Sequence, residues 1–82
     1  MQLQLHPIML EWVDSEAQVG WQYVDNVRVT KLTVQSLGYL VKETDDVVVI
    51  TTSISANDGC MDCLTIPKVA ITKRDDIDYG KE

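Results

Sequence analysis

Two cysteines three residues apart, Cys60 and Cys63, have the type and spacing best suited to chemistry in this chain. A CxxC pair can act as a redox couple, but its first thiol then needs a helix N-terminus, and this pair lies in a predicted strand. A structural zinc site needs about four ligands, and His6 is the single histidine of the sequence. Because residues three apart on an extended strand face opposite sides, we expect the two sulfurs to diverge.

We therefore expect ordinary thiols at both positions, with no bound metal and no cofactor. The alternative is a metal site between subunits. Two cysteines are also too few for a disulfide framework, which fits a reducing compartment.

No set of residues typical of catalysis accompanies the cysteines. His6 lies beside Pro7 and has no serine or cysteine partner in a recognisable motif, which disfavours a role as catalytic base. The acidic residues fall mostly in predicted turns without calcium-loop spacing, and the isolated glycines form no phosphate-binding loop. The sequence thus predicts a protein that is not an enzyme and has no catalytic residues.

Aromatic and basic side chains form the remaining candidate site. Exposed tryptophan and tyrosine are favoured anchors at protein interfaces and can stack on nucleic acid bases. Lysine and arginine near the last strand would add positive charge. We predict the following binding residues: Trp12, Trp21, Tyr39, Lys68 and Arg74. The alternative is that one or both tryptophans fill a barrel end, because the sequence has no phenylalanine to provide bulk.

Charge limits the classes of partner. The formal net charge is −6 and the sequence pI is near 4.5, which opposes attraction to phosphates and disfavours nonspecific duplex DNA. We interpret the acidity as favouring solubility, with mimicry of nucleic acid as the alternative.

The first residues have no basic flank, and no apolar run approaches the roughly 18 residues that cross a bilayer. We therefore expect a soluble cytosolic protein without a membrane partner.

The elements that must position these residues are short strands separated by turns. In the first strand, Ile8, Leu10 and Trp12 share the side expected to face the core. Pro67 cannot donate to a strand ladder and is expected to begin a one-turn connector. We expect strands over 8–13, 29–43, 47–54, 60–66 and 70–74.

Two features predict a bent sheet that meets a second subunit. Gly38 interrupts its strand where the apolar residues change sides, as at a barrel corner. Val47, Val48 and Val49 place apolar residues on both faces of one strand. We predict an all-β fold, a small, strongly bent five-stranded SH3-like or Sm-like barrel with a short 3-10 turn before the last strand. We also predict a homo-oligomer whose interface includes Val47, Val49 and Thr51.

The length sets the domain organisation. A chain of 82 residues is one domain, and a domain this short buries only about 60% of the surface that its unfolded form exposes. We expect a single β-barrel domain over 1–77 and a frayed acidic tail over 78–82. Within the domain, 14–20 is expected to be a loop, and 21–26 is either a short helix or an irregular segment.

Trp12, Asp14 and Ser15 are followed by Gly20-Trp21, then by LGYLVKE over 37–43 and LTIPK over 64–68. With these residues and this spacing, the sequence resembles a group of small uncharacterised proteins from tailed phages and prophages. The resemblance covers most of the chain. It implies a viral origin and action in the cytoplasm of a host bacterium. It implies no activity, because no function is assigned to the group.

A second resemblance concerns strand order. The region 34–74 is similar in strand order and turn placement to Sm and Hfq-like proteins, whose bent strands form rings that bind RNA. The chain differs from that family at the loops that contact RNA, since it has no Gly-Asn or Asp-Asn signature there.

Together these observations predict a non-enzymatic binding or interaction module, encoded by a phage and oligomeric, which modulates a host factor or assists assembly. The alternative is an Sm-like ring that binds RNA or a small nucleotide signal at sites between subunits. The expected partners are further copies of the chain and a host protein, with RNA or a nucleotide in the alternative.

Overall fold

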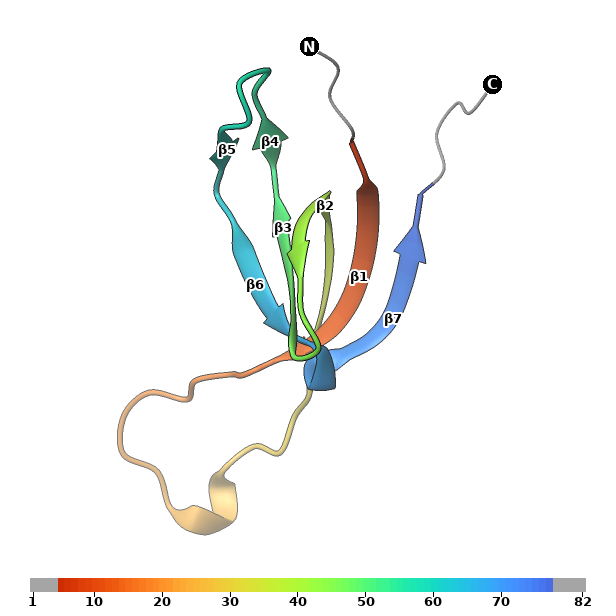
Figure 1. Ribbon diagram of the computed structural model, residues 1–82. Coiled ribbons are helices and arrows are strands. Elements are labelled where there is room, and N and C mark those ends of the chain that lie inside the picture. Colours follow the sequence, from red (N-terminus) through yellow and green to blue (C-terminus); the bar gives the residue numbers. More distant parts are fainter. Residues whose placement is uncertain (1–4, 78–82) are drawn as a thin grey trace.

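The computed structural model describes residues 5–77, so the predicted tail at 78–82 lies outside the described residues. The chain is all-β and is built on a five-stranded antiparallel sheet with the strand order β6-β3-β2-β1-β7 (Figure 1). Within 5–77, no helix is long and apolar enough to cross a membrane. The strands of this sheet are β1 (Pro7–Asp14), β2 (Leu32–Glu43), β3 (Val47–Thr51), β6 (Leu64–Pro67) and β7 (Ile71–Asp76).

The bend predicted at Gly38 is confirmed. The first half of β2 pairs with β1 and the second half pairs with β3, and the two pairings meet at Tyr39. A Cβ added at Gly38 would lie 2.8 Å from the backbone oxygen of Thr51. Glycine therefore suits this position, because the two backbones approach more closely than a side chain allows.

The two strands expected over 47–54 and 60–66 are not continuous. Each is broken, and the outer pieces form a separate hairpin of β4 (Ser53–Ile54) and β5 (Cys60–Met61). Asp62 lies in the left-handed region, with φ 57°, and interrupts the extended chain before β6 begins. The prediction of two long strands was wrong because the strand-like composition extends across this interruption.

The core lies on the inner face of the curved sheet. Trp12, Leu40 and Ile71 pack against it, and this confirms the inward side predicted for the first strand. The buried apolar residues among those described are Ile8, Leu10, Val48, Ile50 and Ile66. A core of this size leaves much apolar surface elsewhere in contact with solvent.

The connector expected after Pro67 is also confirmed. A 3-10 turn, η2 (Lys68–Ala70), joins β6 to β7, and the backbone N–H of Lys68 donates to the carbonyl of Asp46 at 2.8 Å. Among the described residues, β6 and β7 remain the two edges of the sheet, and no strand pairing between them closes it into a barrel.

Residues 15–31, which we name the arm, project away from the sheet between β1 and β2 (Figure 1). Its only regular element among the described residues is the 3-10 turn η1 (Val24–Asn26), within the segment that the sequence left open. The radius of gyration is 16.8 Å, whereas a compact chain of this length would have about 12 Å. The arm thus explains an elongated molecule with extents of 58 × 23 × 22 Å.

Substituting Gly38→Ala should lower the free energy of unfolding by about 1–3 kcal/mol, because a methyl group is forced against a backbone atom that cannot change rotamer. Urea unfolding followed by circular dichroism measures the effect. The control is Gln35→Ala, an exposed position on the same strand, which should change the value by less than about 0.5 kcal/mol. Equal effects of the two substitutions would contradict the close approach.

Candidate functional site

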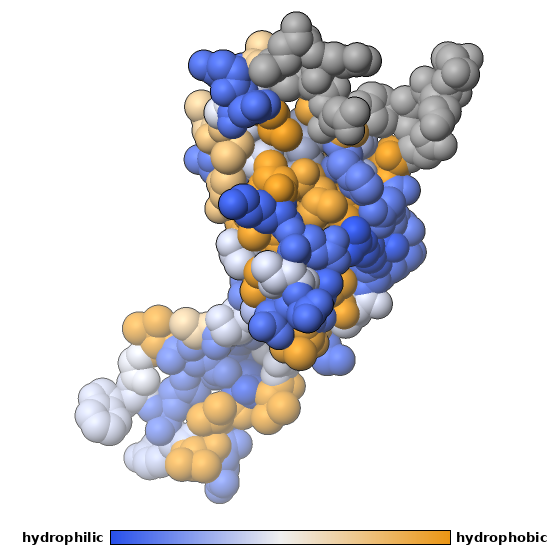
Figure 2. All heavy atoms as spheres, in the orientation of Figure 1, coloured by the Kyte–Doolittle hydropathy of each residue, from blue (hydrophilic) through white to orange (hydrophobic). Residues whose placement is uncertain are grey.

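The arm carries half of the large apolar side chains that are exposed among the described residues. Trp21 has a relative accessibility of 103%, and Val19 and Val29 are almost as exposed. Figure 2 shows apolar residues on the arm that are separate from those of the body. The exposed apolar residues of the arm are Val19, Trp21, Tyr23, Val24, Val27 and Val29.

Polar contacts join the two legs of the arm. The Gln18 side chain donates to the carbonyl of Arg28 at 2.9 Å and accepts from the backbone N–H of Arg28 at 3.1 Å. Glu16 accepts a hydrogen bond from the Thr30 hydroxyl and lies 3.6 Å from the Arg28 guanidinium. The arm is thus tied across its base by its own side chains, which reduces the conformational entropy that its tip would lose on binding.

The tip of the arm presents two aromatic side chains. Gly20 has φ 95°, a conformation that turns the chain just before Trp21. Trp21, Gln22 and Tyr23 line an open hollow of about 330 Å³. Indole and phenol rings held in water on a projecting segment are typical anchors of a protein interface.

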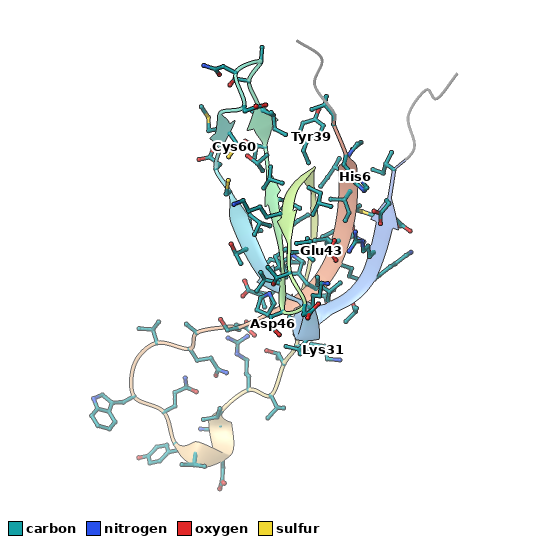
Figure 3. The ribbon with its side chains drawn as sticks, viewed as in Figure 1. His6, Lys31, Tyr39, Glu43, Asp46 and Cys60 are labelled. Atoms are coloured by element: carbon teal, nitrogen blue, oxygen red, sulfur yellow. The ribbon has the colours of Figure 1, made fainter. Side chains whose placement is uncertain are left out.

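The predicted binding residue Trp12 lies elsewhere and has another role. It is partly buried against the core, and its indole N–H donates to the Ser36 hydroxyl at 3.1 Å. Trp12 therefore packs against the core, which agrees with the alternative interpretation for this tryptophan, whereas Trp21 is fully exposed. Tyr39 lies at the bend of β2 (Figure 3), where it lines a groove of about 400 Å³ with Leu37 and other residues.

The predicted cations Lys68 and Arg74 converge on one carboxylate. Lys68 Nζ lies 2.8 Å and Arg74 Nη1 3.0 Å from Glu43 Oε2. Arg74 also contacts Asp76 at 2.8 Å, and Asp76 in turn contacts the His6 ring at 2.6 Å. This network joins the ends of β1, β2 and β7 to η2. Its cations are therefore already paired with carboxylates of the same chain, which weakens a role in binding phosphate.

The residues predicted for a subunit interface separate into two groups. Val47 and Val49 are partly exposed and alternate with the buried Val48, so they lie on the outer face of β3. Thr51 is only 1% exposed, and its hydroxyl donates to backbone carbonyls of the β4–β5 hairpin. The structure therefore leaves the two valines available for such an interface but places Thr51 in the interior.

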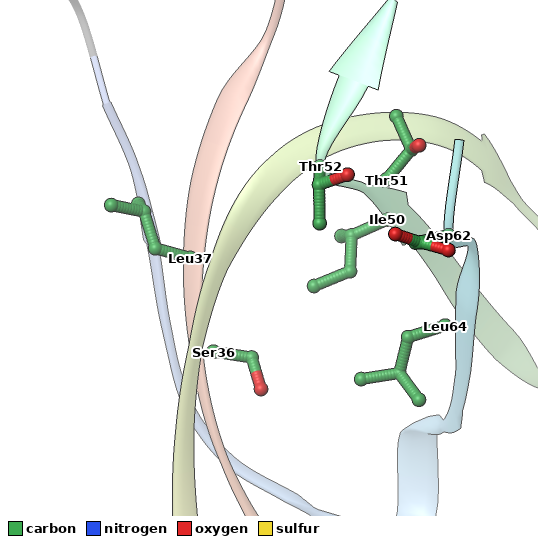
Figure 4. A pocket seen from close by; sticks show the side chains of 7 residues that line it. All are labelled: Ser36, Leu37, Ile50, Thr51, Thr52, Asp62 and Leu64. Atoms are coloured by element: carbon green, nitrogen blue, oxygen red, sulfur yellow. The ribbon is translucent and has the colours of Figure 1, made fainter. Parts of the chain in front are cut away.

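A small cavity of about 220 Å³ opens between the bend of β2 and the start of β6 (Figure 4). Its lining residues are Ser36, Leu37, Ile50, Thr51, Thr52, Asp62 and Leu64. The hydroxyls of Ser36 and Thr51 already take part in hydrogen bonds within the chain. The cavity is thus mainly an apolar opening above the core, with few polar groups left to orient a ligand.

The expectation that the cysteine sulfurs diverge was wrong. Cys60 Sγ and Cys63 Sγ lie 3.3 Å apart, and both residues are exposed. The left-handed Asp62 between them breaks the extended geometry on which that expectation depended. The contact with Cys63 raises the pKa of the Cys60 thiol above its usual value. Within 5–77, no cluster of three or more His, Cys, Asp or Glu side chains could hold a metal ion.

Comparison with known proteins assigns no family or function to the chain. No family model, curated protein or solved structure matches the chain. The resemblances to phage proteins and to Sm and Hfq-like proteins therefore stay predictions.

The network around Glu43 predicts a pH dependence. Hydrogen bonds from Arg74 and then Lys68 lower the pKa of Glu43 from 4.5 to about 2. A carboxylate with a lowered pKa in the folded state stabilises the fold above its unfolded pKa, and this contribution is lost as the pH falls toward the folded pKa. Glu43→Gln should therefore flatten the decrease in Tm as the pH is lowered from about 5 to 2.

The control for this measurement is Asp45→Asn, which removes a carboxylate that makes no ion pair with any described residue. This variant should keep the wild-type profile. A Glu43→Gln profile identical to that of the wild type would show that the network contributes nothing to stability.

Proposed function

We propose that this protein is a non-enzymatic binding module that uses the arm to hold a protein partner, with Trp21 and Tyr23 as the anchors. The exposure of apolar side chains along the arm carries this proposal. Burying apolar surface contributes roughly 25 cal/mol per Å², and buried aromatic anchors dominate the binding energy of many protein interfaces. The cross-links between the legs of the arm support a tip that is preorganised for binding.

The charges of the arm favour a protein over a nucleic acid. Two acidic residues, Glu16 and Asp25, balance Arg28 and Lys31. The affinity of a neutral arm must come mainly from apolar contact, whereas nucleic acid binding depends strongly on unpaired positive charge. With a phage origin, the partner would be a protein of the host bacterium that offers an apolar pocket to Trp21.

The body of the molecule would serve as an oligomeric scaffold of SH3-like architecture. The small core, and Val47 and Val49 on the outer face of β3, support self-association through that face. The alternative ring that binds RNA has less support, because both Lys68 and Arg74 are paired with Glu43. The proposed site of action is the bacterial cytoplasm.

Replacing the anchor tests the proposal. Immobilised wild-type protein should retain a host protein from bacterial lysate, and Trp21→Ala should weaken its retention by about 30-fold or more, as expected for loss of an interface hot spot. Because Trp21 is outside the core, this variant should keep the wild-type Tm. The control is Val69→Ala, a 98% exposed apolar position on η2, which should retain the same protein. Equal retention by both variants would exclude the arm as the binding element.

A single-tryptophan variant identifies what the arm binds. Trp12→Phe leaves Trp21 as the only indole, so its emission should be that of a tryptophan in water and should shift to shorter wavelength when the captured host protein is added. Trp21→Phe, which keeps the partly buried Trp12, should show no such shift. A shift produced by concentrating the protein alone would mean that a second copy, and not a host protein, occupies the arm.

A further inference from the structure

We propose that Cys60 and Cys63 are one half of a thiolate zinc site, which a second copy of the chain completes with its own pair of cysteines. The two sulfurs are 3.3 Å apart and exposed to solvent. In a tetrahedral site with Zn–S bonds of about 2.3 Å, neighbouring sulfurs are about 3.8 Å apart. To bind zinc, the two sulfurs would therefore have to move apart by roughly half an ångström. A disulfide would need an approach to about 2.05 Å, which is a larger movement.

The fold holds the segment between the cysteines in place. The carbonyl of Met61 accepts a hydrogen bond from the Thr51 hydroxyl, a second from the Thr52 N–H at 3.2 Å and a third from the Thr52 hydroxyl at 3.0 Å. Asp62 then turns the chain through its left-handed conformation. The cysteine pair is thus fixed from the core side, because Thr51 itself is buried. Preorganised ligands of this kind favour metal binding.

Among the described residues, no third Cys, His, Asp or Glu side chain joins the pair to complete the site. Thiolate zinc sites take about four ligands, and the sequence contains two cysteines and one histidine. That histidine, His6, is paired with Asp76 of β7, whereas Cys60 lies in β5 of the β4–β5 hairpin (Figure 3). Two hairpins that face each other would supply four thiolates. Asp58 and Asp62 add negative charge around each pair, so a divalent cation would also offset the repulsion between the two hairpins.

The binding step exchanges protons for metal and involves no oxidation. Four S–H bonds break, four Zn–S bonds form, and four protons pass to solvent. Zinc has no redox chemistry of its own, and a site closed by four thiolates has a structural role.

Titration of the reduced full-length protein with Zn²⁺, in competition with a chromophoric chelator, tests the site. We expect one zinc per two chains, and light scattering should show a mass twice that of the metal-free protein. Co²⁺ in place of Zn²⁺ should give the spectrum of a tetrahedral ion with four thiolates. One metal per chain at unchanged mass, or no binding in competition with the chelator, would overturn the proposal.

Single substitutions distinguish zinc binding by the two thiols from the effects of changes elsewhere in the chain. Cys60→Ser and Cys63→Ser should each abolish zinc binding and the zinc-dependent change in mass, while Met61→Leu, which keeps the backbone carbonyl between them, should retain both. Trp21→Ala should also retain both, so the fate of the arm does not affect the outcome. For wild-type protein, zinc should protect both thiols from alkylation. Alkylation at the same rate with and without zinc would contradict the site even if a variant failed to fold.

Discussion

The close approach between β2 and the end of β3 is the constraint on which the rest of the structure depends. Because Gly38 has no side chain, the backbone of Thr51 can pass beside it, and β2 can bend from one partner strand to the next. The bend curves the sheet around a core of five buried apolar residues. It also buries Thr51, whose hydroxyl holds Met61 and thereby the cysteine pair.

The ion pairs of the body and the apolar side chains of the arm together determine which surface a partner can bind. The chain is acidic, and two of its seven basic residues, Lys68 and Arg74, are paired with Glu43 at the end of β2, Arg74 also with Asp76. Half of the large exposed apolar side chains among the described residues lie on the arm, whose positive and negative charges balance. The arm and the β4–β5 hairpin lie at opposite ends of the body (Figure 1), so the proposed partner site and the proposed metal site can act independently.

Local sequence patterns predicted most of the sheet. Alternation of apolar and polar residues identified the inward side of the first strand, and a glycine where the apolar side changes identified the bend. A proline after a strand identified the 3-10 connector. A loop was predicted over 14–20 and 21–26 was left open, but the projection of 15–31 as an arm was not predicted, and the strand expected from residue 29 begins only at Leu32. The available signal was an apolar segment between 15 and 31 without the regular alternation of a strand.

The sequence by itself determined the all-β class, the bend at Gly38 and the connector after Pro67, because short-range periodicity and backbone preference are local properties. Only the tertiary structure decided that Glu43 would gather Lys68 and Arg74, that Trp21 would stay in water while Trp12 packed against the core, and that Cys60 and Cys63 would meet. Each of these contacts and exposures depends on the direction that the backbone takes after a turn. A single left-handed residue, Asp62, was enough to reverse the expected direction of two side chains.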